Sequence, residues 1–134
     1  MKKTLLLLLL VVNVLQAELR EIKELRLKKD VEQQMIISDS LIKRALKFRW
    51  TLYAGDGLTM HLNFNDFNRQ FILYQDYKRD SFALTLLPKA SAFKREPYLL
   101  LVFKKFDQLT KEVVFTLLID DDENRAQIKF INKR

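Results

Sequence analysis

The sequence contains no cysteine, and this single absence excludes several kinds of site. Without thiols the protein cannot form disulfides, thiolate metal sites, a cysteine nucleophile or a lipid link to an N-terminal cysteine. The two glycines are too few for a glycine-rich loop around phosphate groups, and the one histidine cannot supply a two-histidine metal site. We therefore expect a non-catalytic protein that carries no cofactor and no metal.

The one histidine, His61, falls on the polar side of an alternating segment. A simple hairpin would place it near Thr51 or Arg49. A serine–histidine nucleophile would also need a serine in a shaped turn, and the sequence has no Gly-x-Ser-x-Gly motif. We interpret His61 as an ordinary surface residue.

The acidic run near the C-terminus resembles a calcium-binding loop only in its first half. Asp120, Asp122 and Asn124 match the first three ligand positions of an EF-hand loop, in which side-chain oxygens bind the cation. Arg125 then occupies the position of the required glycine, and Ile131 stands where the closing glutamate belongs. We interpret the run as a solvated turn.

The N-terminus has the three-part layout of a secretory signal peptide. Lys2 and Lys3 precede the unbroken apolar run Leu5–Val12, and the small residue Ala17 ends the segment. The apolar core is about eleven residues long, whereas a helix needs about 20 to cross a bilayer. We predict cleavage after Ala17, so that the mature chain begins at Glu18 and is periplasmic, in a bacterium with two membranes. An uncleaved anchor helix is the competing interpretation.

The formal net charge of the chain is +7, and +5 remains once Lys2 and Lys3 are removed with the leader. In the cytoplasm such an excess of basic residues would suggest a nucleic-acid partner. Outside it, the available polyanions are lipid headgroups, lipopolysaccharide phosphates and acidic proteins. The basic residues are spread along the chain, which is equally consistent with a role in solubility alone. We expect another envelope protein or an anionic envelope lipid as partner, and no nucleic acid.

Residues 18–40 are dense in charge and contain neither glycine nor proline. Opposite charges stand four residues apart, as in Arg20 and Glu24, which is the spacing that lets them meet on a helix. Apolar residues recur at the same interval: Leu27, Val31 and Met35. This pattern predicts an N-terminal helix over residues 19–35, with a strand from Gln34 as the alternative for its last part.

From Leu41 the apolar period changes to two, which is typical of half-buried strands. We expect one inward face for Leu46, Phe48, Trp50 and Leu52. Gly55 and Gly57 lie where the first hairpin must reverse. About seven strands are predicted: 46–52, 58–64, 70–77, 82–87, 98–106, 113–119 and 127–131.

The connections between these strands are too short for a helical crossover, so the strands should be antiparallel. The last two strands are expected to pair around the acidic run. We therefore predict a mainly β domain over residues 41–134, an antiparallel meander that forms a curved sheet or a partly closed barrel.

Two clusters combine an aromatic residue with neighbouring cations, a combination that suits an anionic surface. The first lies in the polar connection Pro88–Pro97 and consists of Lys89, Phe93, Lys94 and Arg95. The second follows Tyr74 and consists of Tyr77, Lys78 and Arg79. We predict partner binding at both clusters. The competing interpretation of Phe93 is that it covers one end of the core.

The leader, the β pattern and the two clusters favour an exported, non-catalytic binding module of the cell envelope. Two alternatives remain open. Ten phenylalanines could line a barrel cavity that carries a small apolar ligand or lipid. If the leader is misinterpreted, a basic, aromatic-bearing β-barrel in the cytoplasm would instead resemble an oligonucleotide-binding fold.

The predicted leader can be tested directly. N-terminal sequencing of protein recovered from the periplasmic fraction is expected to begin at Glu18, because export removes the apolar segment. Recovery of cytosolic protein that still begins at Met1 would contradict this expectation.

Overall fold

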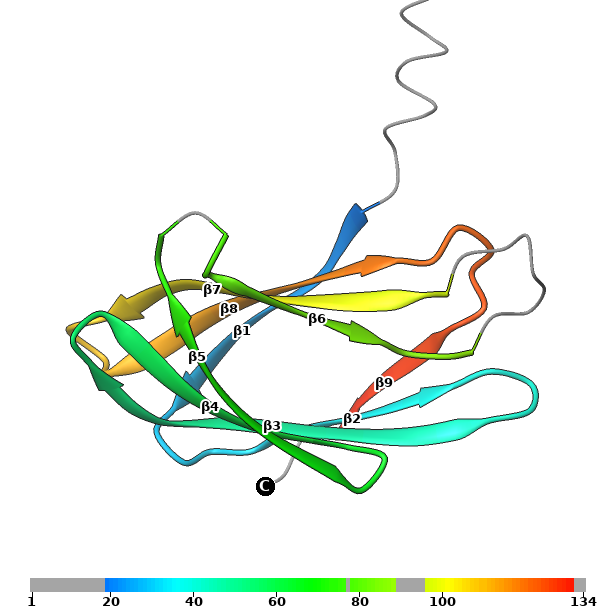
Figure 1. Ribbon diagram of the computed structural model, residues 1–134, viewed down its shortest axis with the longest axis horizontal. Helices are drawn as coiled ribbons and strands as arrows, with labels where there is room; N and C mark the ends of the chain where they lie inside the picture. Colours follow the sequence, from blue (N-terminus) through cyan, green and yellow to red (C-terminus); the bar gives the residue numbers. More distant parts are fainter. Residues whose placement is uncertain (1–18, 77, 89–95, 132–134) are drawn as a thin grey trace, which may run out of the picture.

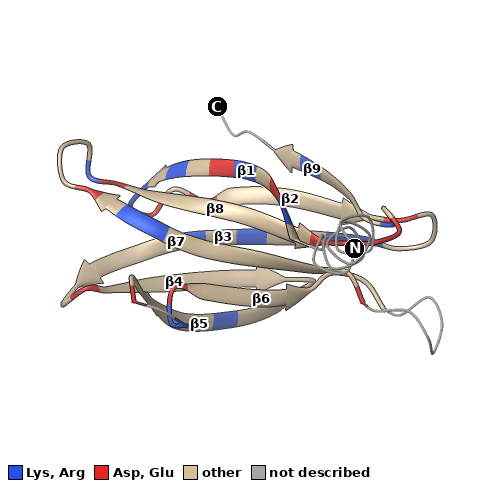
Figure 2. Cartoon of the chain, turned by 90° about the horizontal axis from the view of Figure 1, so that it is seen from above, with Lys and Arg blue, Asp and Glu red and all other residues tan. Residues whose placement is uncertain are grey.

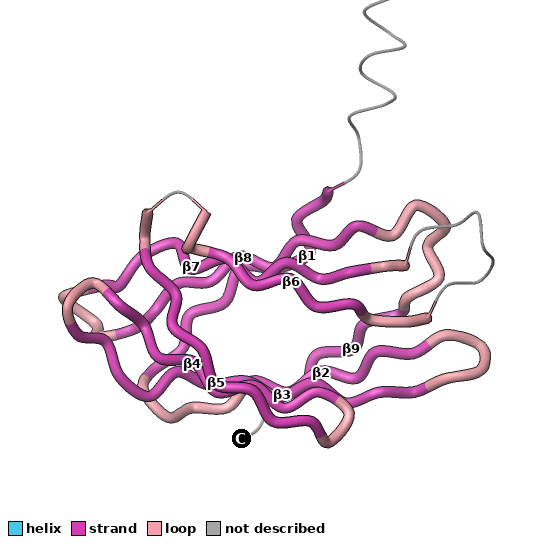
Figure 3. Tube along the Cα trace, in the orientation of Figure 1, coloured by secondary structure: helices cyan, strands magenta, loops and turns pink. Residues whose placement is uncertain are grey.

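The computed structural model describes residues 19–76, 78–88 and 96–131. Within these ranges the chain forms β-strands joined by turns and loops, and no helix (Figure 3). The strands are β1 (Leu19–Lys28), β2 (Gln33–Ser38), β3 (Lys43–Ala54), β4 (Gly57–Phe64), β5 (Phe67–Tyr74), β6 (Ser81–Thr85), β7 (Tyr98–Asp107), β8 (Glu112–Asp120) and β9 (Gln127–Ile131). The prediction of a mainly β protein is confirmed.

The strands form two antiparallel sheets that face each other (Figure 1). One sheet, which we call sheet A, has the strand order β1-β8-β7-β6, and the other, sheet B, has the order β5-β4-β3-β2-β9. Each sheet keeps two edges of its own in the described part of the chain, so the layers do not close into a barrel. The predicted meander is present as two runs of hairpins, β2 to β5 and β6 to β8.

The chain passes between the sheets after β1, after β5 and after β8. The edges of the two sheets meet on both sides of the sandwich. On one side the Lys23 Nζ of β1 lies 4.5 Å from the ring centroid of Phe130 in β9. On the other side Phe71 of β5 stacks on Phe82 of β6, with ring centroids 4.2 Å apart. On each side of the sandwich, an edge strand of one sheet therefore contacts an edge strand of the other.

Tight turns in sheet B are made by residues that tolerate a positive φ. In the β3–β4 hairpin Gly55 and Asp56 have φ values of 58° and 63°, the conformation of the two-residue turn that matches hairpin twist. Asn65 and Asp66 have φ values of 52° and 69° in the β4–β5 hairpin. The reversals predicted at these places are confirmed, although Gly57 is already the first residue of β4.

The alternation of β3 changes phase at one point. Phe48 and Trp50 point inward and are 1% and 4% exposed, as the period of two predicts. The register with β4 then shifts between Trp50 and Leu52, so that Leu52 is 53% exposed while the Tyr53 ring contacts Phe103 of sheet A. The prediction that Leu52 shares the inward face is therefore wrong, because a bulge adds one residue to the strand.

Aromatic side chains of β3 connect the two layers. Phe48 meets Phe115 of β8 edge to face, with ring centroids 5.9 Å apart, and Trp50 meets Phe106 of β7 at 6.0 Å. The Trp50 Nε1–H also donates a hydrogen bond of 2.8 Å to the backbone C=O of Leu27 in β1. β3 is thereby bound to β1, β7 and β8 of sheet A.

Residues 19–35 do not form the predicted helix. The chain there makes β1, a turn in which Asp30 has a φ of 66°, and the start of β2. Leu25 and Leu27 are both 6% exposed, and the charged residues around them face outward, a period of two that the four-residue spacing concealed. Burial of two leucines between sheets outweighs the roughly 0.2–0.5 kcal/mol that each charge pair offers a helix.

The number of strands and one pairing also differ from the prediction. The described residues hold nine strands instead of about seven, because residues 19–38 add two. β9 does not pair with β8; it pairs with β2 in sheet B, where Phe130 lies opposite Met35. The acidic run therefore crosses between sheets instead of closing a hairpin.

The predicted leader, residues 1–17, and Glu18 lie outside the described ranges. No helix in the described part of the chain is long and apolar enough to cross a membrane.

Replacing Trp50 tests the link between the layers. Trp50→Phe keeps a buried ring but removes the indole N–H, which leaves the Leu27 carbonyl without this donor. We expect the free energy of unfolding in urea to fall by about 1–3 kcal/mol. Leu52→Ala, at an exposed position of the same strand, is the control and should change it by less than about 0.5 kcal/mol. Equal and small effects of both changes would contradict this role of Trp50.

Candidate functional site

Most of the predicted partner-binding residues lie outside the described ranges: Tyr77, Lys89, Phe93, Lys94 and Arg95. Lys78 and Arg79 are described. The structure thus shows the framework that carries both clusters, and the contacts expected of the five other residues stay predictions.

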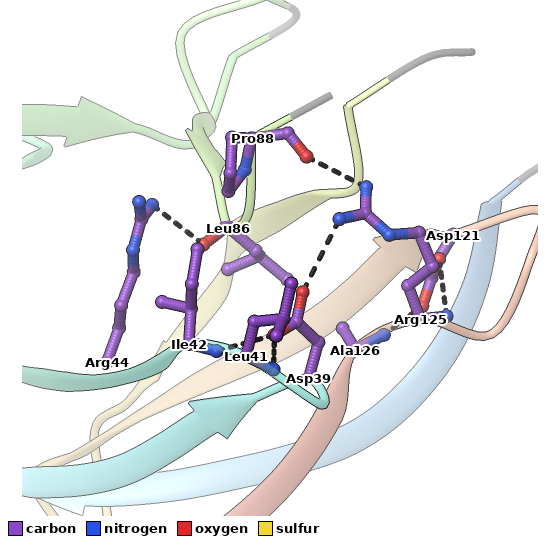
Figure 4. Close-up of polar contacts among 9 residues, drawn as sticks. All are labelled: Asp39, Leu41, Ile42, Arg44, Leu86, Pro88, Asp121, Arg125 and Ala126. Carbon is purple, nitrogen blue, oxygen red and sulfur yellow. Dashed lines mark hydrogen bonds and ion pairs between the residues drawn. The ribbon is translucent and has the colours of Figure 1, made fainter. Parts of the chain in front are cut away.

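The base of the Pro88–Pro97 connection is held by hydrogen bonds from three directions. The Leu86 N–H donates to the Pro97 C=O at 2.8 Å and joins the two ends of the connection. Arg125 Nη1 donates to the Pro88 C=O at 2.8 Å, and Arg44 Nη1 donates to the Leu86 C=O at 3.1 Å (Figure 4). Because Arg44 belongs to β3 and Arg125 follows β8, both sheets determine where this connection leaves the sandwich.

Arg125 also joins the β2–β3 turn to this cluster, which we call the Arg125 clamp. Its Nη2 lies 3.4 Å from an Asp39 carboxylate oxygen, and the two side chains are only 19% and 12% exposed. The other Asp39 oxygen accepts the N–H groups of Leu41 at 2.8 Å and Ile42 at 2.7 Å. Asp121 in turn accepts the backbone N–H of Arg125 at 3.1 Å. Three connections at one end of the sandwich are therefore fixed by polar contacts.

These bonds hold the pKa of the Asp39 carboxyl below its usual value. The N–H groups of Leu41 and Ile42 lower it most, and the positive charge of Arg125 adds to their effect. Partial burial opposes them. The clamp is therefore built around the ionised form of Asp39.

The second predicted cluster surrounds the crossing from β5 to β6. Arg79 forms an ion pair with Asp76, and its guanidinium lies 4.4 Å from the ring centroid of Tyr74. Its hydrogen bonds lower the pKa of Asp76. Arg79 is thus already engaged within its own loop. This loop precedes β6 whereas Pro88 follows it, so Arg79 and the base of the Pro88–Pro97 connection lie at opposite ends of that strand (Figure 1).

A third group of polar side chains lies on the outer face of sheet B, in a place that the sequence did not single out. It lines a shallow hollow of about 670 Å³ across β3, β4 and β5, beside the β1–β2 turn. Its charged lining residues are Asp30, Glu32, Lys47, Arg49 and Arg69. Its uncharged polar lining residues are His61, Asn63, Asn68 and Gln70. We call it the sheet B hollow.

Strand register arranges these side chains in rows. One row runs across the three strands through Arg49, His61 and Gln70, because His61 is opposite both of the others. The next row runs in the same way through Lys47, Asn63 and Asn68. Since opposite residues in a sheet share a face, each row points its side chains to one side. Figure 2 shows that basic residues also lie on strands of sheet A, so the hollow is distinguished by its amides and not by charge alone.

Contacts inside the hollow are few and polar. The His61 Nε2 lies 3.0 Å from the Thr51 Oγ1, which confirms the predicted position of His61 near Thr51 or Arg49. Asn63 Nδ2 donates to Asn68 Oδ1 at 2.7 Å. The arrangement offers hydrogen-bond donors and acceptors to a ligand.

One signal in the sequence could have indicated this hollow. Outward polar residues at alternate positions occur in three consecutive strands: Lys47 and Arg49, His61 and Asn63, and Asn68 and Gln70. Their convergence depends on register, which is set by the two tight turns between these strands.

The acidic run has a structural use. Asp121 accepts backbone N–H groups of Arg125 and Ala126, which shapes the turn that carries the Arg125 clamp. Within the described ranges, no three His, Asp or Glu side chains are grouped closely enough to hold a metal ion.

Comparisons of the chain with protein-family models, curated proteins and solved structures found no match.

The Arg125 clamp predicts a loss of stability in acid. A carboxyl whose pKa is lowered by folding stabilises the folded state above its ordinary pKa of 3.8, and this contribution disappears as the pH falls through the lower, folded value. We expect Asp39→Asn to melt at a lower temperature than the wild type near neutral pH, and to lose less further stability between about pH 5 and pH 2. Thermal melts across this interval provide the measurement.

The control for this change is Asp66→Asn, which removes a charge from an exposed turn residue. It should leave the acid-induced loss of stability close to that of the wild type. Parallel melting curves for Asp39→Asn and the wild type at every pH would show that the Asp39 charge contributes nothing.

Proposed function

We propose that the protein is an exported, non-catalytic binding module of the cell envelope, and that the sheet B hollow binds the anionic headgroup of an envelope lipid. The observation that supports this best is the convergence of Lys47 and Arg49 with the side-chain amides of Asn63, Asn68 and Gln70 on one sheet face. Phosphate groups are bound by such combinations of cations and neutral hydrogen-bond donors.

The cations of the hollow are available for an anion. Lys47 forms no ion pair with another residue in the described part of the chain. Arg49 contacts Asp30 at 3.5 Å, and both side chains are about half exposed, at 44% and 55%. An exposed pair of this kind contributes at most about 1 kcal/mol, so a phosphate can compete for the guanidinium.

The charges also indicate where in the hollow an anion would lie. Asp30 and Glu32 are on the β1–β2 turn, close to the Arg49 end. The row of Lys47, Asn63 and Asn68 lies on the other side of the row of Arg49 and His61 from these carboxylates' end of the hollow. We therefore place the headgroup phosphate in this second part of the hollow, where Lys47 and two amides occur without a carboxylate among the lining residues.

The interior of the sandwich offers no support to the alternative of a small-ligand carrier. The void between the sheets, which Phe48 and Phe82 help to line, measures about 10 Å³. A space of this size holds one water molecule at most. A ligand is therefore expected on the surface.

The lining of the hollow also favours a headgroup over a nucleic-acid strand. Single-stranded nucleic acids bind through exposed aromatic rings on which bases stack. Phe48 is the one aromatic residue in the described lining, and it is 1% exposed. The predicted aromatic clusters around Phe93 and Tyr77 would then act as additional contacts with the membrane surface, as we expect from their composition.

Vesicle binding tests the proposal. The wild type should cosediment with phosphatidylglycerol vesicles and not with phosphatidylcholine vesicles. Each cation near an anionic membrane contributes about 1 kcal/mol, a factor of about five in affinity. The double change Lys47→Glu with Arg49→Glu should therefore weaken binding at least about 25-fold.

The matched control is Lys104→Glu with Lys105→Glu on β7 of sheet A, which changes the net charge by the same amount at exposed positions. It should retain binding within about threefold at physiological salt, where distant charges are screened. Equal losses in both double variants would show that net charge alone drives binding. Absence of binding by the wild type would overturn the proposed headgroup.

A further inference from the structure

The edge strands of the two sheets are protected to different degrees. β6 and β9 have five residues each, and β1 carries six charged residues among its ten. Short length and charge are the means by which proteins keep sheet edges from pairing with other chains. β5 has neither protection: it is eight residues long, and Arg69 is its one charged residue.

No described strand covers the outer edge of β5. Among the described strands it pairs with β4 alone, and it lies at the outer limit of the sandwich (Figure 2). Phe67 and Ile72 are 73% and 51% exposed, and the residues 68–70 between them are exposed as well. An extended chain can therefore reach its free side.

One hydrogen bond shows which backbone groups of β5 face this free side. The Tyr74 N–H donates to the Arg79 C=O at 2.8 Å, and so it points away from β4. In an antiparallel ladder alternate residues direct their N–H and C=O groups to the same side. Asn68, Gln70 and Ile72 therefore each present one N–H and one C=O to the outside.

We propose that β5 pairs with the β5 strand of a second copy of this chain. The two strands run antiparallel, with Gln70 opposite the same residue of the other copy on the two-fold axis. Asn68 of each copy then lies opposite Ile72 of the other. The two B sheets become one continuous sheet.

The hydrogen-bonding pattern and the charges together select this register. In an antiparallel pair, two opposite residues either both point their N–H and C=O groups at each other or both point them away. A two-fold axis between two copies of β5 must therefore lie at one residue, which is then opposite the same residue of the other copy. An axis at Arg69 would place two like charges against each other. An axis at Phe71 would place Asn68 opposite Tyr74, whose N–H already bonds to Arg79. An axis at Gln70 avoids both the repulsion between two Arg69 side chains and the pairing with Tyr74.

A second copy suits this edge because β5 is compatible with itself. In the proposed register Arg69 lies opposite Phe71 of the other copy and on the same face, where a guanidinium can stack on the ring. No charged residue meets a like charge along the strand. In this register the outward N–H and C=O groups of Asn68, Gln70 and Ile72 all have hydrogen-bonding partners. An unrelated strand of different length or charge need not supply all of these partners.

The absence of cysteine makes a direct test possible, since an introduced thiol is the only one in the chain. In the proposed dimer the two Gln70 Cα atoms are about 5.5 Å apart, within the range that a disulfide spans. Gln70→Cys should therefore form a disulfide-linked dimer under mild oxidation, seen on a non-reducing gel. The wild-type protein should show a concentration-dependent dimer by sedimentation equilibrium.

Asn68→Cys is the matched control on the same strand and the same face. Its two thiols would be about 13 Å apart along the strands, too far for a disulfide. It should cross-link at least tenfold more slowly than Gln70→Cys. A mixture of Asn68→Cys and Ile72→Cys chains should cross-link efficiently, because these two positions are opposite each other in the proposed register.

A backbone change tests the strand pairing without a thiol. Gln70→Pro removes an N–H that points away from β4, so it should abolish dimerisation while sheet B stays folded. Gln70→Thr loses the same side chain but keeps the N–H, and it should dimerise within about twofold of the wild type. Monomeric wild-type protein, equal cross-linking of Gln70→Cys and Asn68→Cys, or unimpaired dimerisation of Gln70→Pro would each overturn the proposal. None of these outcomes depends on headgroup binding.

Discussion

The packing of β3 against sheet A is the interaction on which the rest of the structure depends. β3 is the central strand of sheet B, and its inward rings, Phe48 and Trp50, meet aromatic residues of β8 and β7. The Trp50 indole bonds to the backbone of β1 as well. In a protein without disulfides this burial replaces covalent links between the layers. Once the layers are fixed, the edges, the crossings and the outward side chains have defined places.

The core and the sheet B hollow lie on opposite faces of the same strands. Lys47 and Arg49 alternate with Phe48 and Trp50, so the period of two that buries the rings also points the cations outward. The tight turns on either side of β4 then bring amides of β4 and β5 beside these cations. The candidate site is therefore a consequence of hairpin register and needs no loop of its own.

Polar contacts hold the connections at both ends of β6 in place. The Arg125 clamp joins three connections at one end of the sandwich, and its hydrogen bonds hold the pKa of Asp39 below the usual value. At the other end of β6, Arg79 bonds within its own loop and closes the last part of the free side of β5. Among the described edge strands, these contacts leave residues 68–72 of β5 unprotected, while β1 is protected by its charges.

Alternation and turn residues by themselves determined that this protein is built from antiparallel strands, where its hairpins reverse, and that His61 lies near Thr51. These features are local, because a side chain two residues away and a residue with positive φ act within one hairpin. Only the tertiary structure decided that residues 19–38 are strands, that Leu52 turns outward, and that β9 pairs with β2. Each of these depends on a partner far along the chain, and burial against that partner outweighs the weaker preferences of the local sequence.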